Sequence, residues 1–316
     1  MTANKKIVNV VQAGSDPFDT PSTIEKFGSL LSQSKAADSE LAVFPEAFIG
    51  GYPKGVDFGA RVGSREADGR DLYRRYWNNA IELGSAEYDA ISELVAANGI
   101  AVVVGVIERK GATLYCSTFG FERDGSLLGV HRKLMPTAME RLIWGFGDGA
   151  DIPIMDSSAG RIVSAICWEN YMPLLRSYYY DHQPQFYCVS TVDDRPVWLP
   201  TMQTIALEGR CFVLSACQYL ERGMIGLSSD EFDAVQGNAP ETVLISGGSC
   251  IISPMGDVLA GPVFGEEAIL AAEIDLDLIP QGKFDLDVAG HYARPDIFEL
   301  RANVAAQHNV RTAETN

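Results

Sequence analysis

The sequence is poor in basic residues. Its 316 residues include 25 lysines and arginines against 42 aspartates and glutamates, which gives a formal net charge of −17. Nucleic acids and anionic membrane surfaces are bound through basic faces, so we expect neither as a partner. Apolar runs are short as well, and none approaches the roughly 20 residues that a membrane-spanning helix needs. The first apolar stretch, residues 7–11, is interrupted by Asn9. It therefore predicts a strand and not the apolar core of a secretory signal.

Cysteine occurs only six times and without closely spaced pairs. The cysteines are scattered, mostly in apolar segments, at Cys116, Cys167, Cys188, Cys211, Cys217 and Cys250. A large chain with this spacing and no export signal is expected to keep its thiols reduced. We therefore predict a cytoplasmic protein.

The motifs of several enzyme classes are missing. There is no C-x-x-C and no H-E-x-x-H, and only four histidines are present, so we do not expect a zinc site. The absence of a G-x-S-x-G elbow disfavours the usual α/β serine hydrolase. Residues 145–150 fit the letters of a dinucleotide fingerprint, G-x-G-x-x-A, but no strand closely precedes them and Pro153 argues against a following helix. Neither a metal nor an organic cofactor is expected.

Strand and helix patterns alternate along the chain. Hydrophobic residues make up 47% of it, enough for one large core, and no change in composition marks a domain boundary. We predict an α/β protein with mixed sheets, one domain over residues 1–301 and a C-terminal tail over residues 302–316. Strands are predicted at residues 6–13, 41–44, 100–107, 113–121, 126–133, 162–166, 185–190, 211–216, 248–253, 258–260 and 268–274. Helices are predicted at residues 23–36, 86–98, 174–180 and 199–208, with a partly helical insertion at 50–85 and a polar loop at 221–246.

Cys167 stands at the end of a predicted buried strand. Trp168, Glu169 and Asn170 follow it, and Pro173 stands in what would be the first turn of a helix. The unpaired N–H groups and the dipole of a helix N-terminus favour a thiolate and can hold an oxyanion. Cys167 is therefore a candidate nucleophile. The alternative interpretation is one more core cysteine.

Two further residues at strand ends have chemistry that suits a thiol. Glu46 lies in the apolar sequence VFPEAF, where desolvation would raise the pKa of its carboxyl group toward that of a general base. Lys133 ends another predicted strand and could stabilise a thiolate and a tetrahedral intermediate. The alternatives are a structural glutamate at a strand end and an ordinary surface lysine. No histidine lies in a convincing motif, although distance in the sequence does not exclude proximity in space.

Several segments carry a family resemblance. FPE at residues 44–46, HRKLMPT at 131–137 and CWENYMPL at 167–174 together resemble the nitrilase superfamily of carbon–nitrogen hydrolases and, within it, the true nitrilases. ERLIWGFGDG at 140–149, EGRCFVL at 208–214 and HYARPD at 291–296 extend the resemblance over nearly the whole chain. The segment around the cysteine is the most specific of these.

The resemblance implies a fold and a set of roles. The fold would be an α-β-β-α four-layer sandwich that pairs through helices into a homodimer, the building block of a larger homo-oligomer or spiral. Cys167 would be the nucleophile, Glu46 the general base, Lys133 the stabiliser and Glu140 a further active-site glutamate. The backbone N–H of Trp168 would help Lys133 to hold the intermediate.

The substrate expected from the resemblance is a small organic nitrile. Nitriles are neutral and apolar, so a pocket with aromatic walls would suit them. The candidate wall residues are Tyr52, Trp144, Phe146 and Trp168, with Asp193, Asp194, Arg195 and Trp198 near the entrance. The expected products are the carboxylic acid and ammonia, formed through a cysteine thioimidate and a thioester. The competing interpretations are an amidase or carbamoylase of the same superfamily, a cyanide-hydrolysing enzyme, and a non-catalytic filament protein.

Overall fold

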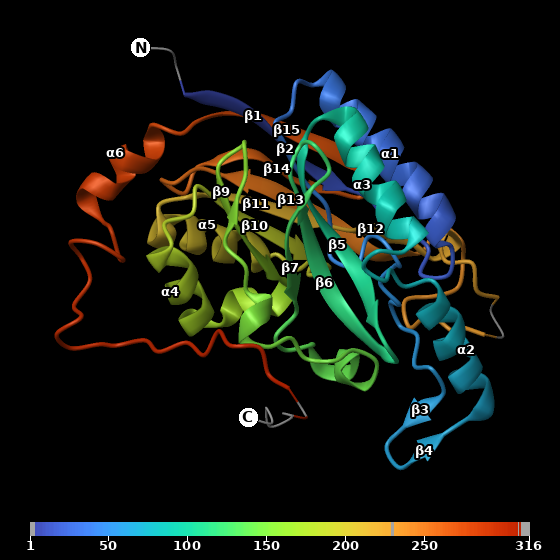
Figure 1. The fold of residues 1–316 in the computed structure, drawn as a ribbon. Coiled ribbons are helices and arrows are strands. Elements are labelled where there is room, and N and C mark those ends of the chain that lie inside the picture. The colour runs from blue at the N-terminus through green and yellow to red at the C-terminus, as the bar shows by residue number, and fades with distance from the viewer. Residues whose placement is uncertain (1–3, 229–230, 309, 311–316) are drawn as a thin grey trace, which may run out of the picture.

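The computed structural model describes residues 4–228, 231–308 and 310. Two β-sheets pack face to face, and helices cover the outer face of each sheet (Figure 1). The predicted α-β-β-α sandwich is therefore confirmed. Within the described part of the chain, no helix is long and apolar enough to cross a membrane.

The first sheet has parallel strands at its centre and antiparallel strands on both sides. Its strands are, in spatial order, β15 (Ala268–Asp275), β1 (Lys5–Gln12), β2 (Leu41–Val43), β5 (Ala101–Lys110), β6 (Thr113–Phe121) and β7 (Leu127–Arg132). Strands β1, β2 and β5 run parallel to one another. Helices α1 (Thr20–Ala36) and α3 (Ala86–Asn98) lie on the outer face of this sheet (Figure 1).

The second sheet is likewise mixed. Its strands are, in order, β12 (Tyr219–Glu221), β13 (Val243–Ile252), β11 (Phe212–Cys217), β10 (Phe186–Thr191), β9 (Arg161–Ile166) and β8 (Met155–Asp156), and β14 (Val258–Phe264) pairs with β13. Strands β9, β10 and β11 are parallel. Helices α4 (Pro173–Asp181) and α5 (Trp198–Gly209) cover the outer face of this sheet.

Local sequence explains where the predicted helices begin and end. The Asp19 side chain accepts the backbone N–H of Ser22 at the start of α1, and Pro21 stands in the first turn. Ser85 caps α3 in the same way, and α3 ends at Gly99, whose φ of 65° is the left-handed conformation that glycine adopts readily. A tight turn, closed by a hydrogen bond of 2.8 Å from the backbone N–H of Glu122 to Ser126 O, connects β6 to β7.

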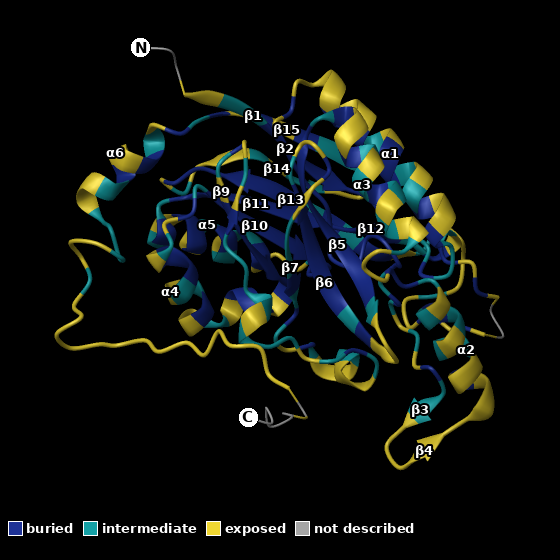
Figure 2. Cartoon of the chain, viewed as in Figure 1, coloured by how far each residue is buried: buried dark blue, intermediate teal, exposed yellow. Residues whose placement is uncertain are grey.

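The buried residues form apolar layers between and outside the sheets. Figure 2 shows the strands as the buried centre of the molecule and the outer sides of the helices as exposed. The layer between the sheets includes Val8, Val43 and Val103 from the first sheet and Ile162, Phe186 and Leu214 from the second. This packing holds the two sheets together, so residues at the ends of their strands can share one site.

Some of the sequence predictions differ from the structure. The helix expected directly after Cys167 is a 3-10 turn, Cys167–Tyr171, and α4 begins only at Pro173. The polar loop predicted at 221–246 ends earlier, because β13 begins at Val243. Helix α6 (Leu278–Asp285) was not predicted, because its eight residues include Pro280 and Gly282 and show little helical periodicity. The insertion at 50–85 is partly helical as predicted, with α2 (Ala67–Asn78) and a small hairpin of β3 (Ala60–Arg61) and β4 (Ser64–Arg65).

After α6 the chain is extended and exposed. It runs along the α4 side of the molecule (Figure 1). The backbone N–H of Gln307 donates to Asp148 Oδ2 at 2.9 Å, which attaches this segment next to the loop that follows β7. Residues 309 and 311–316 of the predicted tail lie outside the described residues.

Candidate active site

Three strands bring candidate residues to one end of the sandwich. Glu46 follows β2, Lys133 follows β7 and Cys167 follows β9. The first two residues therefore come from one sheet and Cys167 from the other. Ligand sites of α/β proteins commonly lie at the carboxyl ends of strands, and this end of the sandwich has that geometry.

The Glu46 loop is fitted closely against strand β5. The backbone N–H of Phe44 donates to Val103 O at 2.8 Å and that of Ile49 donates to Gly105 O at 3.0 Å, so residues 45–48 arch over Gly105. A Cβ atom added to Gly105 would lie 2.8 Å from Glu46 Cα. Only a residue without a side chain leaves room for this loop.

Glu46, Lys133 and Glu140 form a buried row of charges. The Lys133 ammonium donates to Glu46 Oε1 at 2.6 Å and to Glu140 Oε2 at 2.7 Å. The side chains of Glu46 and Lys133 are fully buried. The second oxygen of Glu46, Oε2, is also buried and accepts no hydrogen bond from any residue that the structure describes. An acceptor with no partner at this place is free to take a proton from a thiol or from a water molecule.

Glu140 is held by its own loop and by Tyr52. Its Oε2 also accepts the backbone N–H of Thr137 at 2.6 Å, and its Oε1 accepts the Tyr52 hydroxyl at 2.8 Å. The rings of Tyr52 and Trp144 meet edge to face, 5.7 Å apart, and the Trp144 ring lies 5.7 Å from the Lys133 ammonium. The structure thus brings Tyr52, Trp144 and Glu140 to the same place as Lys133.

The charges in this row change one another's pKa values. Burial raises the pKa of Glu46, Lys133 lowers it, Glu140 raises it, and the result is about 7. Burial lowers the pKa of Lys133, but Glu46, Cys167 and Glu140 together raise it well above its usual value. Lys133 is therefore a permanent cation, and Glu46 can exchange a proton near neutral pH.

Cys167 lies at the edge of this row in a constrained backbone conformation. Its φ is 49°, which is rare for a residue with a side chain and turns the chain sharply where β9 ends. Its carbonyl oxygen accepts the side-chain amide of Asn170 at 2.7 Å. The residue is 4% exposed. A thiol in this position is buried from bulk solvent, and the charges of Glu46 and Lys133 both act on its pKa.

The expected effect of a helix N-terminus on Cys167 is not found. A 3-10 turn separates the thiol from α4, and burial followed by the charge of Glu46 raises the pKa of the Cys167 thiol, whereas Lys133 and Thr191 lower it. The resting group is therefore a thiol, and it needs a base to become a nucleophile.

Trp168 lies at the exposed rim of the site. Its indole N–H donates to Asp193 Oδ2 at 2.8 Å, and the Arg195 guanidinium lies 4.9 Å from its ring centre. Arg195 Nε also donates to Asp193 Oδ1 at 2.7 Å, so the three side chains hold one another. Phe146, another predicted wall residue, is 53% exposed.

Two of the residues predicted near the entrance bind other parts of the fold. Trp198 is 2% exposed, and its indole N–H donates to Ser215 inside the layer between α5 and the second sheet. Its place in the chain suggested a rim residue, but it is the first residue of α5 and faces the sheet. Asp194 accepts the backbone N–H and the hydroxyl of Ser246 and so fixes the loop to β13.

Four residues of the site region were not predicted. Cys116 Sγ lies 3.5 Å from Glu46 Oε1, and Gln218 Nε2 donates to the backbone oxygen of Glu46 at 2.7 Å. Glu169 and His131 form a buried pair at 2.8 Å. Glu169 and His131 lie close to Cys167 and Lys133 in the sequence, which could have indicated that they belong to the site. Their pairing could not be predicted, because they are 38 positions apart.

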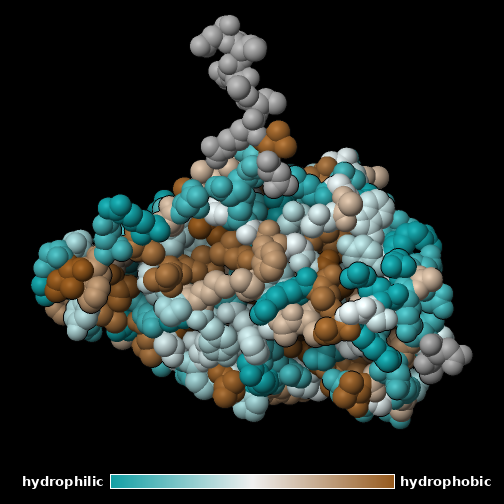
Figure 3. Space-filling model, turned by 90° about the horizontal axis from the view of Figure 1, so that it is seen from below, coloured by the Kyte–Doolittle hydropathy of each residue, from teal (hydrophilic) through white to brown (hydrophobic). Residues whose placement is uncertain are grey.

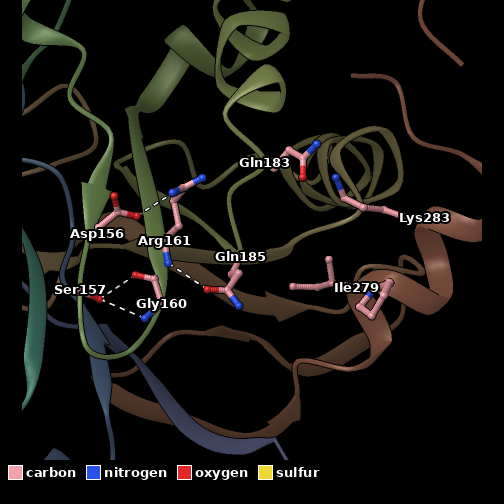
Figure 4. A pocket seen from close by; sticks show the side chains of 9 residues that line it. Asp156, Ser157, Gly160, Arg161, Gln183, Gln185, Ile279 and Lys283 are labelled. Atoms are coloured by element: carbon pink, nitrogen blue, oxygen red, sulfur yellow. Dashed lines mark hydrogen bonds and ion pairs between the residues drawn. The ribbon is translucent and has the colours of Figure 1, made fainter. Parts of the chain in front are cut away.

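A hollow lies at the opposite ends of the parallel strands of the second sheet. It is surrounded by Asp156, Ser157, Gly160, Arg161, Gln183, Gln185, Ile279, Pro280 and Lys283 (Figure 4). None of the predicted site residues lines it, and Arg161 in it already pairs with Asp156 at 2.8 Å. In the described part of the chain, no three His, Cys, Asp or Glu side chains are placed to hold a metal ion.

Comparison with known proteins adds a family to this geometry. Residues 7–284 match the carbon-nitrogen hydrolase family. The chain is 53% identical to a nitrilase of Bradyrhizobium diazoefficiens over 291 residues, covering 92% of this chain and 90% of that protein. It is 48% identical to an arylacetonitrilase of Trametes versicolor over 315 residues, covering 95% and 97% of the two chains.

A solved structure shows the same fold. The NitFhit protein of C. elegans superposes with a TM-score of 0.72 at 19% sequence identity, covering 98% of this chain and 70% of that one. At this level of identity the likeness concerns the architecture alone.

Proposed function

The chain belongs to the carbon–nitrogen hydrolase family and, within it, to the nitrilases, and we propose that it hydrolyses an organic nitrile to the carboxylic acid and ammonia. One observation carries the chemistry: the Lys133 ammonium lies between Glu46 and Glu140, and the charges of this row act on the Cys167 thiol. The group contains a nucleophile, a base and a fixed positive charge. These are the three parts that covalent hydrolysis of a C–N bond by a thiol requires.

The first half of the reaction forms a covalent bond to sulfur. Glu46 takes the thiol proton, and Cys167 Sγ attacks the nitrile carbon. The protonated Glu46 then passes this proton to the nitrile nitrogen, which gives a thioimidate and leaves Glu46 ready to act as a base again. Lys133 and the backbone N–H of Trp168 stabilise the negative charge that develops on the nitrogen. With a pKa of about 7, Glu46 accepts a proton more readily than an ordinary carboxylate does.

The second half uses two water molecules. Glu46 activates the first, which adds to the thioimidate carbon, and the tetrahedral intermediate expels ammonia to leave a thioester. A second water cleaves the thioester to the acid and restores the thiol. If the tetrahedral intermediate expels the thiol instead, the product is the amide. Glu140 acts by holding Lys133 in place.

The walls that we propose for the substrate are aromatic. Tyr52 and Trp144 stand next to Lys133, and Trp168 is 44% exposed at the rim. Aromatic faces suit a neutral, apolar substrate such as a nitrile. The similarity to an arylacetonitrilase makes arylacetonitriles the first substrates to test.

The test is ammonia release from a panel of arylacetonitriles, aromatic and aliphatic nitriles, cyanide and the corresponding amides, with Cys167→Ala as the control. We expect ammonia from organic nitriles with the wild-type chain and none with the variant. Ammonia from amides but not from nitriles would identify an amidase or carbamoylase. Turnover of cyanide alone would identify a cyanide-hydrolysing enzyme, and no turnover of any compound would favour the filament protein.

We also propose that the chain pairs with a second copy through its α4 face. The face seen from below in Figure 1 carries a band of apolar side chains (Figure 3). An apolar groove between α4 and the C-terminal segment is lined by Leu134, Ile152, Tyr171, Met172, Pro173, Leu174, Leu175, Tyr178, Leu300, Arg301 and Ala302. Leu174 is 68% exposed there, and a contiguous apolar surface of this kind is typical of an interface. Such a homodimer would be the building block of a larger homo-oligomer or spiral.

The remaining expectations concern the organisation and location of the chain. Residues 1–301 would act as one hydrolase domain, with residues 302–316 as a tail. All six cysteines are free thiols and buried, which suits the reducing conditions of the cytoplasm.

A further inference from the structure

The Glu169 side chain lies at the junction of the two sheets. It is 1% exposed, and it follows the proposed nucleophile by two positions. Its Oε2 accepts the backbone N–H of Ile166 at 2.7 Å, and its Oε1 accepts the backbone N–H of Leu134 at 2.6 Å. Ile166 directly precedes Cys167, and Leu134 directly follows Lys133. One carboxylate therefore binds the backbone next to both proposed catalytic residues.

This connection crosses between sheets that share no backbone hydrogen bonds at this point. Strand β7, which leads to Lys133, belongs to the first sheet, and β9, which leads to Cys167, belongs to the second. Between the sheets the contacts are largely apolar packing, which is not directional. Hydrogen bonds to a carboxylate fix distance and direction, so Glu169 defines the separation of the two strand ends.

His131 completes the arrangement. Its Nε2 lies 2.8 Å from Glu169 Oε2, and its Nδ1 lies 2.5 Å from the backbone oxygen of Asp151. A carbonyl oxygen only accepts, so Nδ1 carries a hydrogen; the carboxylate already receives two backbone N–H groups, so Nε2 donates as well. Burial is the largest single effect and lowers the pKa of His131, but Glu169 and Asp151 together raise it, and the net shift is upward. An imidazolium facing Glu169 balances the buried negative charge.

We propose that Glu169, together with His131, is a positioning residue that holds the Cys167 turn at a fixed distance from Lys133. We call this arrangement, Glu169 with Ile166 N, Leu134 N and His131 Nε2, the Glu169 clamp. Only the effect of the Glu169 clamp on turnover rests on the proposed function. Its effect on the reactivity of the free thiol is independent of any substrate.

The decisive variant is Glu169→Gln. An amide has one acceptor oxygen where the carboxylate has two, so its NH₂ group must face either a backbone N–H or the His131 donor. The turn then moves away from Lys133, and the thiol loses the nearby cation that lowers its pKa against the opposing effects of Glu46 and Glu140. Glu169→Asp keeps both oxygens on a shorter side chain and should recover part of the lost function.

A matched control is available in the same sheets. The hydroxyls of Thr118 on β6 and Ser164 on β9 are buried and 2.9 Å apart, so they too connect the two sheets. Thr118→Val removes this cross-sheet hydrogen bond without changing the size of the side chain much. Thr118 pairs with His131 across β6 and β7, but its hydroxyl hydrogen-bonds to Ser164 and not to a residue of the clamp. The variant therefore separates the loss of a cross-sheet hydrogen bond from the loss of the Glu169 contacts.

The experiment measures alkylation of Cys167 by iodoacetamide between pH 6 and 10 on the full chain by peptide mass spectrometry, along with kcat and KM for the best nitrile. For folded Glu169→Gln we expect alkylation at pH 7 to slow at least about tenfold and its midpoint to move to higher pH. We expect kcat to fall about 100-fold or more with little change in KM, as for a misplaced catalytic group. Thr118→Val should stay within about twofold of wild type in both measurements.

Two results would overturn the proposal. The first is a folded Glu169→Gln whose Cys167 is alkylated with the rate and pH midpoint of wild type. The second is a Thr118→Val variant that reproduces the loss. Should Glu169→Gln not fold, Glu169→Asp and His131→Gln answer the same question, because unchanged thiol reactivity in both would reject the clamp. If wild type hydrolyses no nitrile but Cys167 reactivity still follows Glu169, the clamp stands and the proposed function fails.

Discussion

At the scale of single residues, the site depends on a carboxylate that is buried beside a cation and still has one free oxygen. Glu46 Oε1 accepts a hydrogen bond from the Lys133 ammonium, whereas Oε2 has no partner among the described residues. A carboxylate with both oxygens saturated would be a structural ion pair, whereas this one can receive a proton. Its burial has an energetic cost that a purely structural role would not explain.

Glu46→Gln tests this role directly. The amide keeps the shape and can still accept from Lys133 through its oxygen, but it cannot take a proton from the Cys167 thiol. We expect kcat to fall by about 10³-fold, within the range for loss of a general base, while the chain stays folded. Ammonia release and a thermal melt measure the two effects. Glu40→Gln is the matched control, because Glu40 pairs with Lys6 at the opposite end of β2 from Glu46; an equal loss in both variants would contradict the assignment.

The pH dependence of kcat/KM gives a second prediction at this scale. Glu46 must be deprotonated to act, so activity should rise with pH through a midpoint near the pKa of about 7. The negative charge of Glu140 is one of the causes that raise this pKa. In Glu140→Gln the acid limb should therefore move to lower pH, while kcat falls about tenfold because Lys133 loses one of its two carboxylate partners. A limb that stays in place or moves to higher pH would show that Glu46 is not the titrating base.

At the scale of elements, each catalytic residue is delivered by a strand and then set by a loop. For Glu46 the loop rests on β5, where Gly105 leaves no room for a side chain. Gly105→Ala should push the loop away from β5, with overpacking destabilising the fold by about 1–3 kcal/mol and activity falling about 100-fold. Urea unfolding and kcat measure the two effects.

Gly28→Ala is the control for that substitution. Gly28 lies in α1, where an added Cβ would lie 2.9 Å from the flexible end of Leu94 and far from the site. Because Leu94 can move aside and alanine favours a helix more than glycine does, it should change stability little and leave kcat unchanged. A Gly105→Ala variant that loses stability but keeps full kcat would mean that the Glu46 loop is not positioned by β5.

Among the elements of the site, the strands could be predicted from the sequence, whereas the turn after Cys167 and the Glu169 clamp could not. The strands that lead to Glu46, Lys133 and Cys167 were predictable, because buried strands have continuous apolar runs that end in recognisable residues. The turn after Cys167 was predicted as a helix, since Pro173 does begin one, but the positive φ of Cys167 and the 3-10 turn arise from tertiary contacts. The Glu169 clamp was not predictable either, because two of its three partners, Leu134 and His131, are 35 and 38 positions away and come from the other sheet.

At the scale of the whole molecule, the sandwich is closed by α1 and α3 on one side, whereas the α4 side carries an exposed apolar groove. If two copies pair through this groove, a charge there should separate them. Leu174→Glu places a carboxylate at a residue that is 68% exposed, so it should leave the fold intact. In a paired assembly the same carboxylate would be buried without a partner, which is strongly unfavourable.

We therefore expect Leu174→Glu to reduce the mass in solution to that of a single chain at micromolar concentration, measured by analytical ultracentrifugation. Leu83→Glu is the control, because Leu83 is 41% exposed and precedes α3 on the opposite helical layer. That variant should keep the assembly of the wild type. An assembly that survives Leu174→Glu but dissociates in Leu83→Glu would place the interface on the α1–α3 layer.

The α4 face connects to the active site through Leu134, which lines the groove and whose backbone N–H donates to Glu169. Dissociation should therefore also lower kcat.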